Sequence, residues 1–390
     1  MRILMAVHHE LDPNAGAAGA SWQLAEEYRR LGHETEIYSF SDLPRAIPAK
    51  LKPLAFPWFL GWRLKTRSGR RPDIADISTG DAWIVGRVRR SANRPVIVTR
   101  SYGLEHTAHE AFLAHVRRKA IRGPSWRYRL YHGGFRLWEV AASLRSSDLN
   151  LMVSEHDARY VHEVLKIPVE RVRVVPHGIP DAFAGQPLRT VSENTESPIG
   201  IAMIGSHLWR KGIQYAAEAL NIVLAEYPQA HVTFLGTVHG REEVIRHYSP
   251  RVQARITVVP RYQRQILPVL VRDHVINLFP TLYEGFSLAL VEAMACGLAP
   301  IVTSAPGASE FLRDGYDALI VPPADGGALR RAVEKLILDR SLLNRIRRSA
   351  HQTAQGFTWS RVAGQTLQYY SEALEATPQS MMPVSLHGSS

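Results

Sequence analysis

Short apolar segments of strand length alternate with helical segments along this chain, and the alternation starts afresh near its middle. In the first half we expect a strand at 2–6, a glycine-containing loop at 14–19, a helix at 21–31 and a strand at 34–39. Further strands are expected at 73–78, 96–100, 149–153 and 172–175. This order is typical of a doubly wound α/β domain, whose parallel strands are covered by helices on both faces.

The second half repeats this order after a polar, turn-rich segment at 185–198, which we interpret as the linker. Strands are expected at 199–204, 231–235, 256–259, 275–279, 299–303 and 318–320. The sequence therefore predicts two Rossmann-like domains, residues 1–185 and 186–355, with a ligand beyond the carboxyl ends of their strands. Helices should follow up to residue 375, and the tail 376–390 has the composition of a disordered end.

Cysteine content and hydropathy limit where such a chain can work. Cys296 is the one cysteine, which excludes an intramolecular disulfide and fits a reducing cytoplasm. The first residues resemble a strand rather than a signal peptide, and no uninterrupted apolar run reaches membrane-spanning length. We expect a cytoplasmic protein that is either free or bound peripherally to a membrane.

The net charge of +11 is concentrated in two segments, 61–72 and 117–136, where Arg and Lys alternate with aromatic residues. Such segments suit a layer of anionic lipid headgroups. The alternative is solvated helix faces whose aromatic rings point inward. Nucleic-acid binding is less favoured, because no helix-turn-helix, zinc-ligand or RNA-binding sheet motif accompanies the charge.

The most informative segment for function is 280–325, which begins at the end of a predicted strand. Ser287 is placed to cap a helix at 288–296, and Gly297 is placed to end it. Glu284 then lies in the loop before the helix, and Glu292 lies inside it. A helix N-terminus favours an anion, and carboxylates accept hydrogen bonds from hydroxyls. Phosphates and hydroxyls occur together in a sugar nucleotide.

This segment resembles the donor-site signature of retaining glycosyltransferases of family 4, which have the GT-B fold of two facing Rossmann-like domains. The matching residues are Glu284, Gly285, Phe286, Ser287, Glu292, Ala293, Met294, Ala295, Gly297, Glu310 and Gly315. The resemblance implies that residues 1–185 bind the acceptor and residues 186–355 bind the nucleotide sugar. It also implies that 356–375 form a closing helix that crosses back to the first domain.

The resemblance implies roles for this segment in binding the donor. Glu284 should contact hydroxyls of the donor sugar, and Glu292 should accept hydrogen bonds from the ribose. Gly285 belongs to the same signature, and backbone N–H groups should point to the donor from Phe286, Ser287 and Leu288.

Two cations follow the first strand of the second domain, where the family neutralises the donor diphosphate. We assign this role to Arg210 and Lys211. Preorganised cations lower the barrier because the leaving nucleoside diphosphate gains negative charge in the transition state. The nucleotide base should pack near Arg261 and Tyr262, although a buried core tyrosine is an equal alternative for Tyr262.

In the first domain, Gly16 corresponds to the second glycine of the family's glycine pair, and Ala15 replaces the first. Tyr102 stands where the family often has a histidine beside the reacting centre. Either His106 takes a similar part or the position is not essential, and Glu105 is expected on the same acceptor side. No metal site is expected, since no carboxylate or cysteine joins the nearby histidines at ligand spacing, and no cofactor is expected.

The resemblance therefore implies a retaining hexosyltransferase that uses a nucleotide sugar, preferably a UDP-sugar, and forms an α-linkage to a hydroxyl. Its acceptor would be a glycan or glycolipid, lipopolysaccharide or exopolysaccharide. The alternatives are a nucleotide-sugar epimerase or phosphorylase with the same fold, and a nucleotide-sugar-binding subunit that has lost turnover. The least favoured alternative is a basic nucleic-acid-binding protein.

Overall fold

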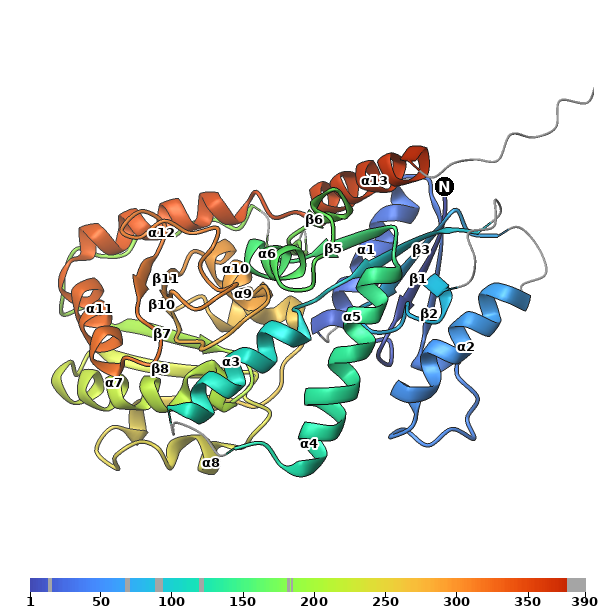
Figure 1. Ribbon diagram of the computed structural model, residues 1–390. Coiled ribbons are helices and arrows are strands. Elements are labelled where there is room, and N and C mark those ends of the chain that lie inside the picture. The colour runs from blue at the N-terminus through green and yellow to red at the C-terminus, as the bar shows by residue number, and fades with distance from the viewer. Residues whose placement is uncertain are drawn as a thin grey trace, which may run out of the picture.

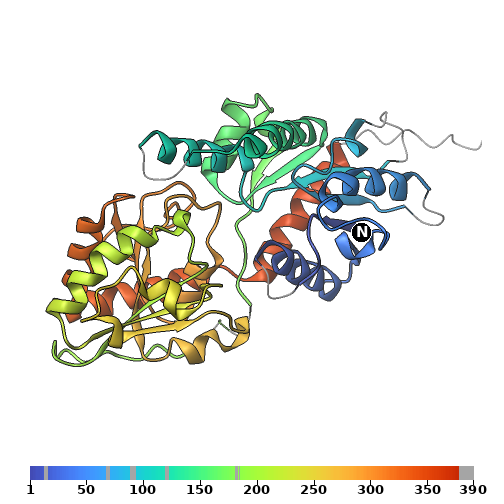
Figure 2. The same ribbon diagram turned by 90° about the horizontal axis from the view of Figure 1, so that it is seen from below.

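The computed structural model describes residues 1–12, 16–66, 71–87, 94–118, 123–180, 183 and 185–376. Two parallel six-stranded sheets form two separate lobes, which confirms the predicted pair of Rossmann-like domains (Figures 1 and 2). The first sheet contains β1 (Arg2–Val7), β2 (Glu34–Ser39), β3 (Ile74–Ser78), β4 (Val96–Arg100), β5 (Leu149–Met152) and β6 (Val172–Val174). The second contains β7 (Ile199–Ile204), β8 (Ala230–Leu235), β9 (Ile256–Val259), β10 (His274–Phe279), β11 (Ala299–Thr303) and β12 (Leu319–Val321).

The strand orders place one switch point inside each sheet. The first sheet has the order β2-β1-β3-β4-β5-β6, and the second has the order β12-β11-β10-β7-β8-β9. Successive strands are added first on one side and then on the other, and this change occurs between β1 and β3 in the first sheet and between β7 and β10 in the second. Because ligands bind beyond the carboxyl ends of strands at such points, the loops after these four strands are where a site is expected.

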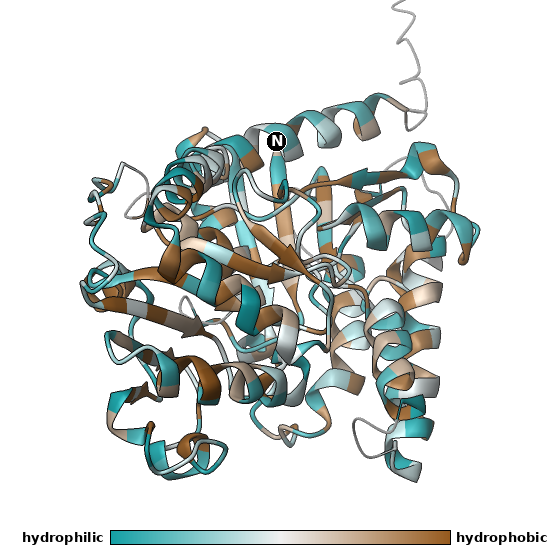
Figure 3. Cartoon of the chain, turned by 90° about the vertical axis from the view of Figure 1, so that its left-hand side faces the viewer, coloured by the Kyte–Doolittle hydropathy of each residue, from teal (hydrophilic) through white to brown (hydrophobic). Residues whose placement is uncertain are grey.

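Helices cover both sheets, and the apolar strands lie inside with the polar helix faces outside (Figure 3). The first domain carries α1 (Gly16–Arg30), α2 (Lys52–Thr66), α3 (Glu105–Arg117), α4 (Trp126–Leu130), α5 (Leu137–Ser146) and α6 (Glu155–Glu163). A π-helical turn, η3 (Tyr131–Arg136), joins α4 to α5. The rest of the chain forms α7 (Ile213–Glu226), α8 (Arg241–Ile245), α9 (Leu267–Leu270), α10 (Leu288–Ala295), α11 (Gly326–Leu338), α12 (Arg340–Ala354) and α13 (Trp359–Ala376).

Two expectations about the ends of the chain need comment. The glycine-containing loop expected at 14–19 is shorter, because α1 already begins at Gly16; Asn14 and Ala15 lie outside the described residues. The tail beyond residue 376 lies outside them as well. Across the described ranges, none of the helices has both the length and the apolar character needed to cross a bilayer.

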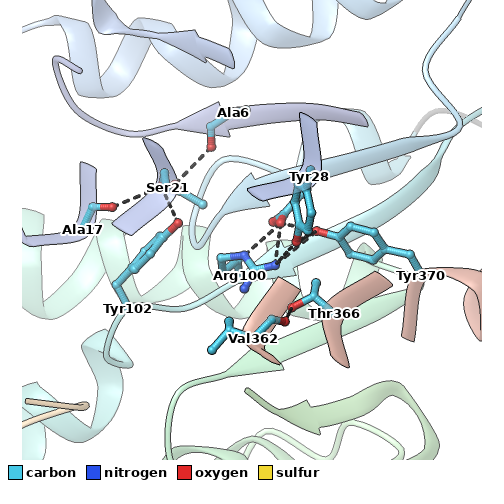
Figure 4. A network of polar contacts seen from close by, with 11 residues as sticks. Ala6, Ala17, Ser21, Tyr28, Arg100, Tyr102, Val362, Thr366 and Tyr370 are labelled. Atoms are coloured by element: carbon cyan, nitrogen blue, oxygen red, sulfur yellow. Dashed lines mark hydrogen bonds and ion pairs between the residues drawn. The ribbon is translucent and has the colours of Figure 1, made fainter. Parts of the chain in front are cut away.

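The last helix, α13, packs on the first domain beside α1 (Figures 1 and 2). A buried polar network fixes it there (Figure 4). Arg100 at the end of β4 donates from Nε to Asp76 over 2.8 Å and from Nη2 to the Tyr370 hydroxyl over 3.1 Å. Tyr370 of α13 also bonds Asp76, and Tyr28 of α1 donates to Tyr370. The C-terminal helix is therefore part of the first domain's core.

Several contacts hold the two domains against each other, and three hydrogen bonds are among them. The Tyr283 hydroxyl lies 2.8 Å from Thr107 Oγ1 of α3. The Glu310 carboxylate accepts the backbone N–H groups of Glu155 and His156, at the N-terminus of α6, over 2.8 and 3.1 Å. A carboxylate is well placed there, because the first N–H groups of a helix have no partner inside the helix.

Buried histidines should make the fold sensitive to acid. Burial lowers the pKa of four of them, to about 3 for His177 and to about 4 for His106, His207 and His274. The unfolded chain, with histidine pKa values of about 6.5, binds more protons below that pH. Stability is therefore complete above pH 6.5 and falls as the pH drops towards 4, by about 1.4 kcal/mol per pH unit for each histidine.

Urea unfolding at several pH values between 7.5 and 5 measures this slope. His274→Gln should flatten it by the share of one histidine, because His274 is buried and bonds Thr233 away from the cleft. A free energy of unfolding that does not change over this range would contradict the prediction.

Candidate active site

A cavity of about 750 Å³ lies between the domains at the carboxyl ends of both sheets. The second domain contributes the loops after β7 and β10 and the start of α10, and the first domain contributes the start of α1 and the loop after β4. The residues predicted to bind the donor that line it are Gly16, Arg210, Lys211, Arg261, Tyr262, Glu284, Phe286, Ser287, Leu288 and Glu292. Tyr102, predicted on the acceptor side, lines it too.

The loop after β7 presents its two cations from a fixed backbone. Gly212 has a φ of +68°, and a Cβ there would lie 1.9 Å from the Pro280 carbonyl oxygen, so glycine is required. The Arg210 carbonyl accepts hydrogen bonds from the Leu282 N–H over 2.8 Å and from the Thr281 hydroxyl over 3.1 Å. These bonds join the loop after β7 to the loop after β10. They fix the backbone position of Arg210 and of the adjacent Lys211.

Arg210, Lys211 and Glu284 form a charged cluster in the cavity. The ammonium of Lys211 bonds the Glu284 carboxylate directly, and Arg210 Nη1 lies 3.4 Å from each of its oxygens. Burial lowers the pKa of Lys211, and Glu284 opposes this effect. Gly307 keeps Glu284 in place, since a Cβ at Gly307 would lie 1.9 Å from the Glu284 carbonyl oxygen.

Helix α10 begins at the wall of the same cavity. The Ser287 side chain caps it by accepting the Leu290 N–H over 3.3 Å. Leu288 and Ala289, in the first turn, line the cavity. The N-terminal partial charge of the helix and the two cations therefore act on the same space, which is suited to an anion.

The nucleoside end of the predicted site contains an ion pair that the sequence did not reveal. Arg264 bonds the Glu292 carboxylate inside the cavity wall, and the side chains are 13% and 5% exposed. Burial raises the pKa of Glu292, and the Arg264 guanidinium opposes that rise. Glu292 thus has a cation as its partner, where the resemblance implied a ribose. Tyr262 lines the cavity close by, with its pKa raised chiefly by burial.

On the first-domain side, Tyr102 and His177 form the wall. Their rings stack with centroids 5.2 Å apart, and the Tyr102 hydroxyl bonds Ser21 of α1 (Figure 4). Burial lowers the pKa of His177 to about 3, so its ring is neutral at pH 7. His177 was not predicted as a site residue. Its place directly after the last strand of the first domain was the only signal in the sequence.

Two predicted site residues need correction. His106 lines neither this cavity nor the second cavity described below. Helix α3 begins at Glu105 and turns the His106 ring towards the Tyr160 ring, and the ring centroids are 5.9 Å apart. Gly285 does not line the cavity either. A Cβ on Gly285 would lie 2.5 Å from Gly103 Cα, so its absence lets the backbones of the two domains touch.

A second cavity, of about 400 Å³, adjoins the first through the shared residues Ala17 and Tyr102. It lies at the switch point of the first sheet and includes Glu105, which the sequence placed on the acceptor side. His8 lines it, and Nδ1 of His8 lies 2.8 Å from a carboxylate oxygen of the fully buried Asp81. No role was predicted for His8, because only the fold brings Asp81 next to it.

Within the described ranges, no group of three or more His, Cys, Asp or Glu side chains is arranged to hold a metal ion.

Comparison with known proteins assigns both domains. The model described as Glycosyltransferase Family 4 matches residues 15–183, and the model described as Glycosyl transferases group 1 matches residues 198–339. The chain belongs to the family 4 glycosyltransferases. It is thus a glycosyltransferase with the GT-B fold.

Individual relatives of this glycosyltransferase are distant. The serotype-specific mannosyltransferase WbdA of Escherichia coli is 24% identical over 61% of this chain, which spans only 30% of WbdA. Sucrose-phosphate synthase from Thermosynechococcus elongatus superimposes with a TM-score of 0.75 at 19% identity, over 96% of this chain and 99% of that one. Anabaena Alr3699/HepE in complex with UDP-glucose superimposes with a TM-score of 0.67 at 16% identity, over 95% of this chain and 100% of that one. These structures share the fold.

The Arg264–Glu292 pair should matter for the stability of the glycosyltransferase. Removing one partner of a buried ion pair leaves an uncompensated charge, so Glu292→Met or Arg264→Met alone should cost about 3–5 kcal/mol. The double variant should lose less than the sum. Urea unfolding of the four proteins measures the coupling, and additive losses would show that the two side chains do not act as a pair.

Proposed function

We propose that this glycosyltransferase transfers a hexosyl group from a nucleotide sugar to a hydroxyl acceptor with retention, which gives an α-linkage. The donor is a UDP-sugar, and the acceptor belongs to a glycolipid, lipopolysaccharide or exopolysaccharide. The Arg210–Lys211–Glu284 cluster beside the start of α10 carries the proposal. The preference for UDP draws on Anabaena HepE, whose structure contains UDP-glucose. The lipopolysaccharide acceptor draws on a solved structure of the same fold, WaaG, which is described as a glycosyltransferase involved in lipopolysaccharide biosynthesis.

The charged cluster suits a donor that brings its own negative charge. A diphosphate arriving at Arg210 and Lys211 competes with Glu284 for both cations. The freed Glu284 carboxylate can then accept hydrogen bonds from sugar hydroxyls. The departing nucleoside diphosphate gains charge as the glycosidic bond breaks, so the cations and the N–H groups of α10 stabilise the transition state more than the bound donor.

The remaining walls suit the other parts of the two substrates. Tyr262, Arg264 and Glu292 surround the end expected to hold the nucleoside. The acceptor belongs in the second cavity, where Nδ1 of His8 is occupied by Asp81 and Nε2 is left to meet a hydroxyl. We propose that neither a metal nor another cofactor is needed, because side-chain cations already face the diphosphate. A cytoplasmic location also stays a prediction.

Donor binding is tested by thermal stability against UDP-, GDP-, ADP- and dTDP-sugars. A donor at about 100 times its dissociation constant should add about 2.7 kcal/mol of stability. We expect a shift in the unfolding temperature with the UDP-sugars.

Two further measurements test the reaction itself. The anomeric configuration of the product, read by proton NMR, tests retention, and the activity of EDTA-treated enzyme tests whether a metal is needed. A shift without hydrolysis or transfer would indicate a binding subunit, and no shift with any nucleotide would contradict the proposal.

Lys211→Met should lower kcat about 10²–10³-fold, because one preorganised cation facing the leaving group is lost. Lys335→Met, which removes an exposed lysine from the last turn of α11, is the matched control and should leave kcat unchanged. Steady-state kinetics with the best donor measures both. Equal activities of the two variants would rule out the role of Lys211.

His8→Ala or Asp81→Asn should lower transfer to the acceptor about 10–100-fold, the worth of one charge-assisted hydrogen bond. Donor binding, measured by thermal shift, should stay as in the wild type. His9→Gln changes the neighbouring ring while it keeps the His8–Asp81 pair, and it should have a much smaller effect. A loss of donor binding in the His8 variant would contradict the assignment of His8 to the acceptor.

A further inference from the structure

All four described tryptophans that are more than a third exposed lie in one part of the first domain. Trp58 and Trp62 of α2 are 61% and 64% exposed, and Trp126 of α4 and Trp138 of α5 are 67% and 45% exposed. Aromatic residues of this size usually bury most of their surface, and exposed apolar patches mark sites of interaction. The aromatic side chains of these segments therefore do not simply point inward, which was one of the two interpretations of the sequence.

Ring contacts join Trp58 to Trp138, and Trp62 and Trp126 lie on the same helical segments as these two. Trp83 packs edge-on against Trp58 of α2 and against Trp138 of α5, with ring centroids 5.6 and 5.2 Å apart. Trp138 in turn stacks on Phe135 of η3 at 5.8 Å. Figure 1 shows α2 and the α4–α5 helix on the same side of the first domain. We call the surface formed by Trp58, Trp62, Trp83, Trp126, Phe135 and Trp138 the aromatic face.

The charge around the aromatic face is of one sign. Residues 43–72 and 111–138 together contain 15 Lys and Arg residues and no Asp or Glu. Without them, the remaining chain has 32 basic residues against 36 acidic ones, so the whole positive excess of the protein is in these two segments. Lys65, Arg127 and Arg129 are exposed beside the tryptophans. Basic residues next to exposed Trp suit the headgroup region of an anionic bilayer.

The aromatic face also borders the cavity assigned to the acceptor. Pro53 of α2 and three residues of η3, Tyr131, His132 and Arg136, line that cavity. The same two elements thus carry the exposed apolar side chains and the walls of the cavity. A molecule held in a membrane by its apolar part would meet the cavity with its polar part.

We propose that the aromatic face docks on an anionic phospholipid surface and that the acceptor is a lipid-linked hydroxyl compound delivered from that surface. The second half of this proposal rests on the proposed function, and the first half does not. Trp58, Trp62 and Trp138 enter the headgroup region, and Arg127 and Arg129 contact the lipid phosphates. The donor cavity stays open to water, because its walls come from the interdomain loops.

Vesicle binding tests the docking with the full chain. The protein is mixed with vesicles of phosphatidylcholine alone or with about 30 mol % phosphatidylglycerol, and binding is followed by co-sedimentation and tryptophan emission. We expect binding and a blue shift with the anionic vesicles only, weakened as salt is raised from about 0.1 to 0.5 M. Quenching by brominated lipid should follow, since the four most exposed tryptophans lie on this face. Equal binding to both vesicles, or none, would overturn the proposal.

Matched variants identify the surface. Trp58→Ser with Trp62→Ser should lower the partition coefficient at least about tenfold, because binding scales with the apolar area inserted. Arg127→Glu with Arg129→Glu should lower it by about fivefold or more for each charge. Val269→Ser with Leu338→Ser removes apolar side chains that are 64% and 59% exposed on the second domain, and should change nothing. An equal loss in this control would refute the assignment.

Other occupants of the aromatic face give distinct results. Dimers in size-exclusion chromatography that the Trp58/Trp62 variant dissolves would show a second copy of the chain on this face and overturn the proposal. Tight, salt-sensitive binding of duplex DNA that competes with vesicles would also overturn it. The thermal shift with nucleotide sugars is measured on every variant. Failure of vesicle binding with an intact shift would refute the docking and leave the proposed function standing.

Discussion

The ion pair between Asp76 and Arg100 is the interaction on which the two-domain architecture depends. Both side chains are buried, and they hold Tyr370 of α13 in the core of the first domain. The chain must therefore leave the first domain after β6, build the second and return. At the return, the Ile179 N–H donates to the Phe357 carbonyl over 2.8 Å, and Gly178 packs so close that a Cβ would lie 2.6 Å from the Trp359 nitrogen. The two crossings lie side by side, so a narrow hinge region joins the two domains.

This hinge explains why the cleft is built from residues that touch across it. Gly103 and Gly285 bring the backbones of the two domains together, and Tyr283 reaches Thr107 on the other side. Tyr102 follows Arg100 by two residues, so the network that fixes α13 also sets the position of the ring shared by both cavities. The two cavities, which we propose hold the donor and the acceptor, adjoin at Tyr102 because both lie at switch points of their sheets.

The sequence predicted most strands within one or two residues, because strands buried on both faces of a parallel sheet read as continuous apolar runs. The loop that contains Glu284 was also predictable, because Ser287 caps the helix after it and Gly297 follows the end of that helix. His106 was misplaced because its neighbours do not determine which side of α3 faces the cleft. Arg264 was missed for a similar reason. Its partner Glu292 is 28 residues away, and a basic residue in a short turn carries no signal of burial. Contacts between residues that are distant in the sequence were thus the ones that sequence patterns could not predict.

Both carboxylates assigned to the donor are already neutralised by cations of their own domain, Glu284 by Lys211 and Arg210 and Glu292 by Arg264. An empty site with these groups unpaired would pay the cost of isolated buried charges. Under the proposed function, binding a nucleotide sugar exchanges one set of ion pairs for another, so the electrostatic gain in the ground state is small. The gain grows as the bond to the leaving group breaks, because the diphosphate then carries more charge while Glu284 does not. The same cations that add little to donor affinity can in this way lower the barrier to transfer.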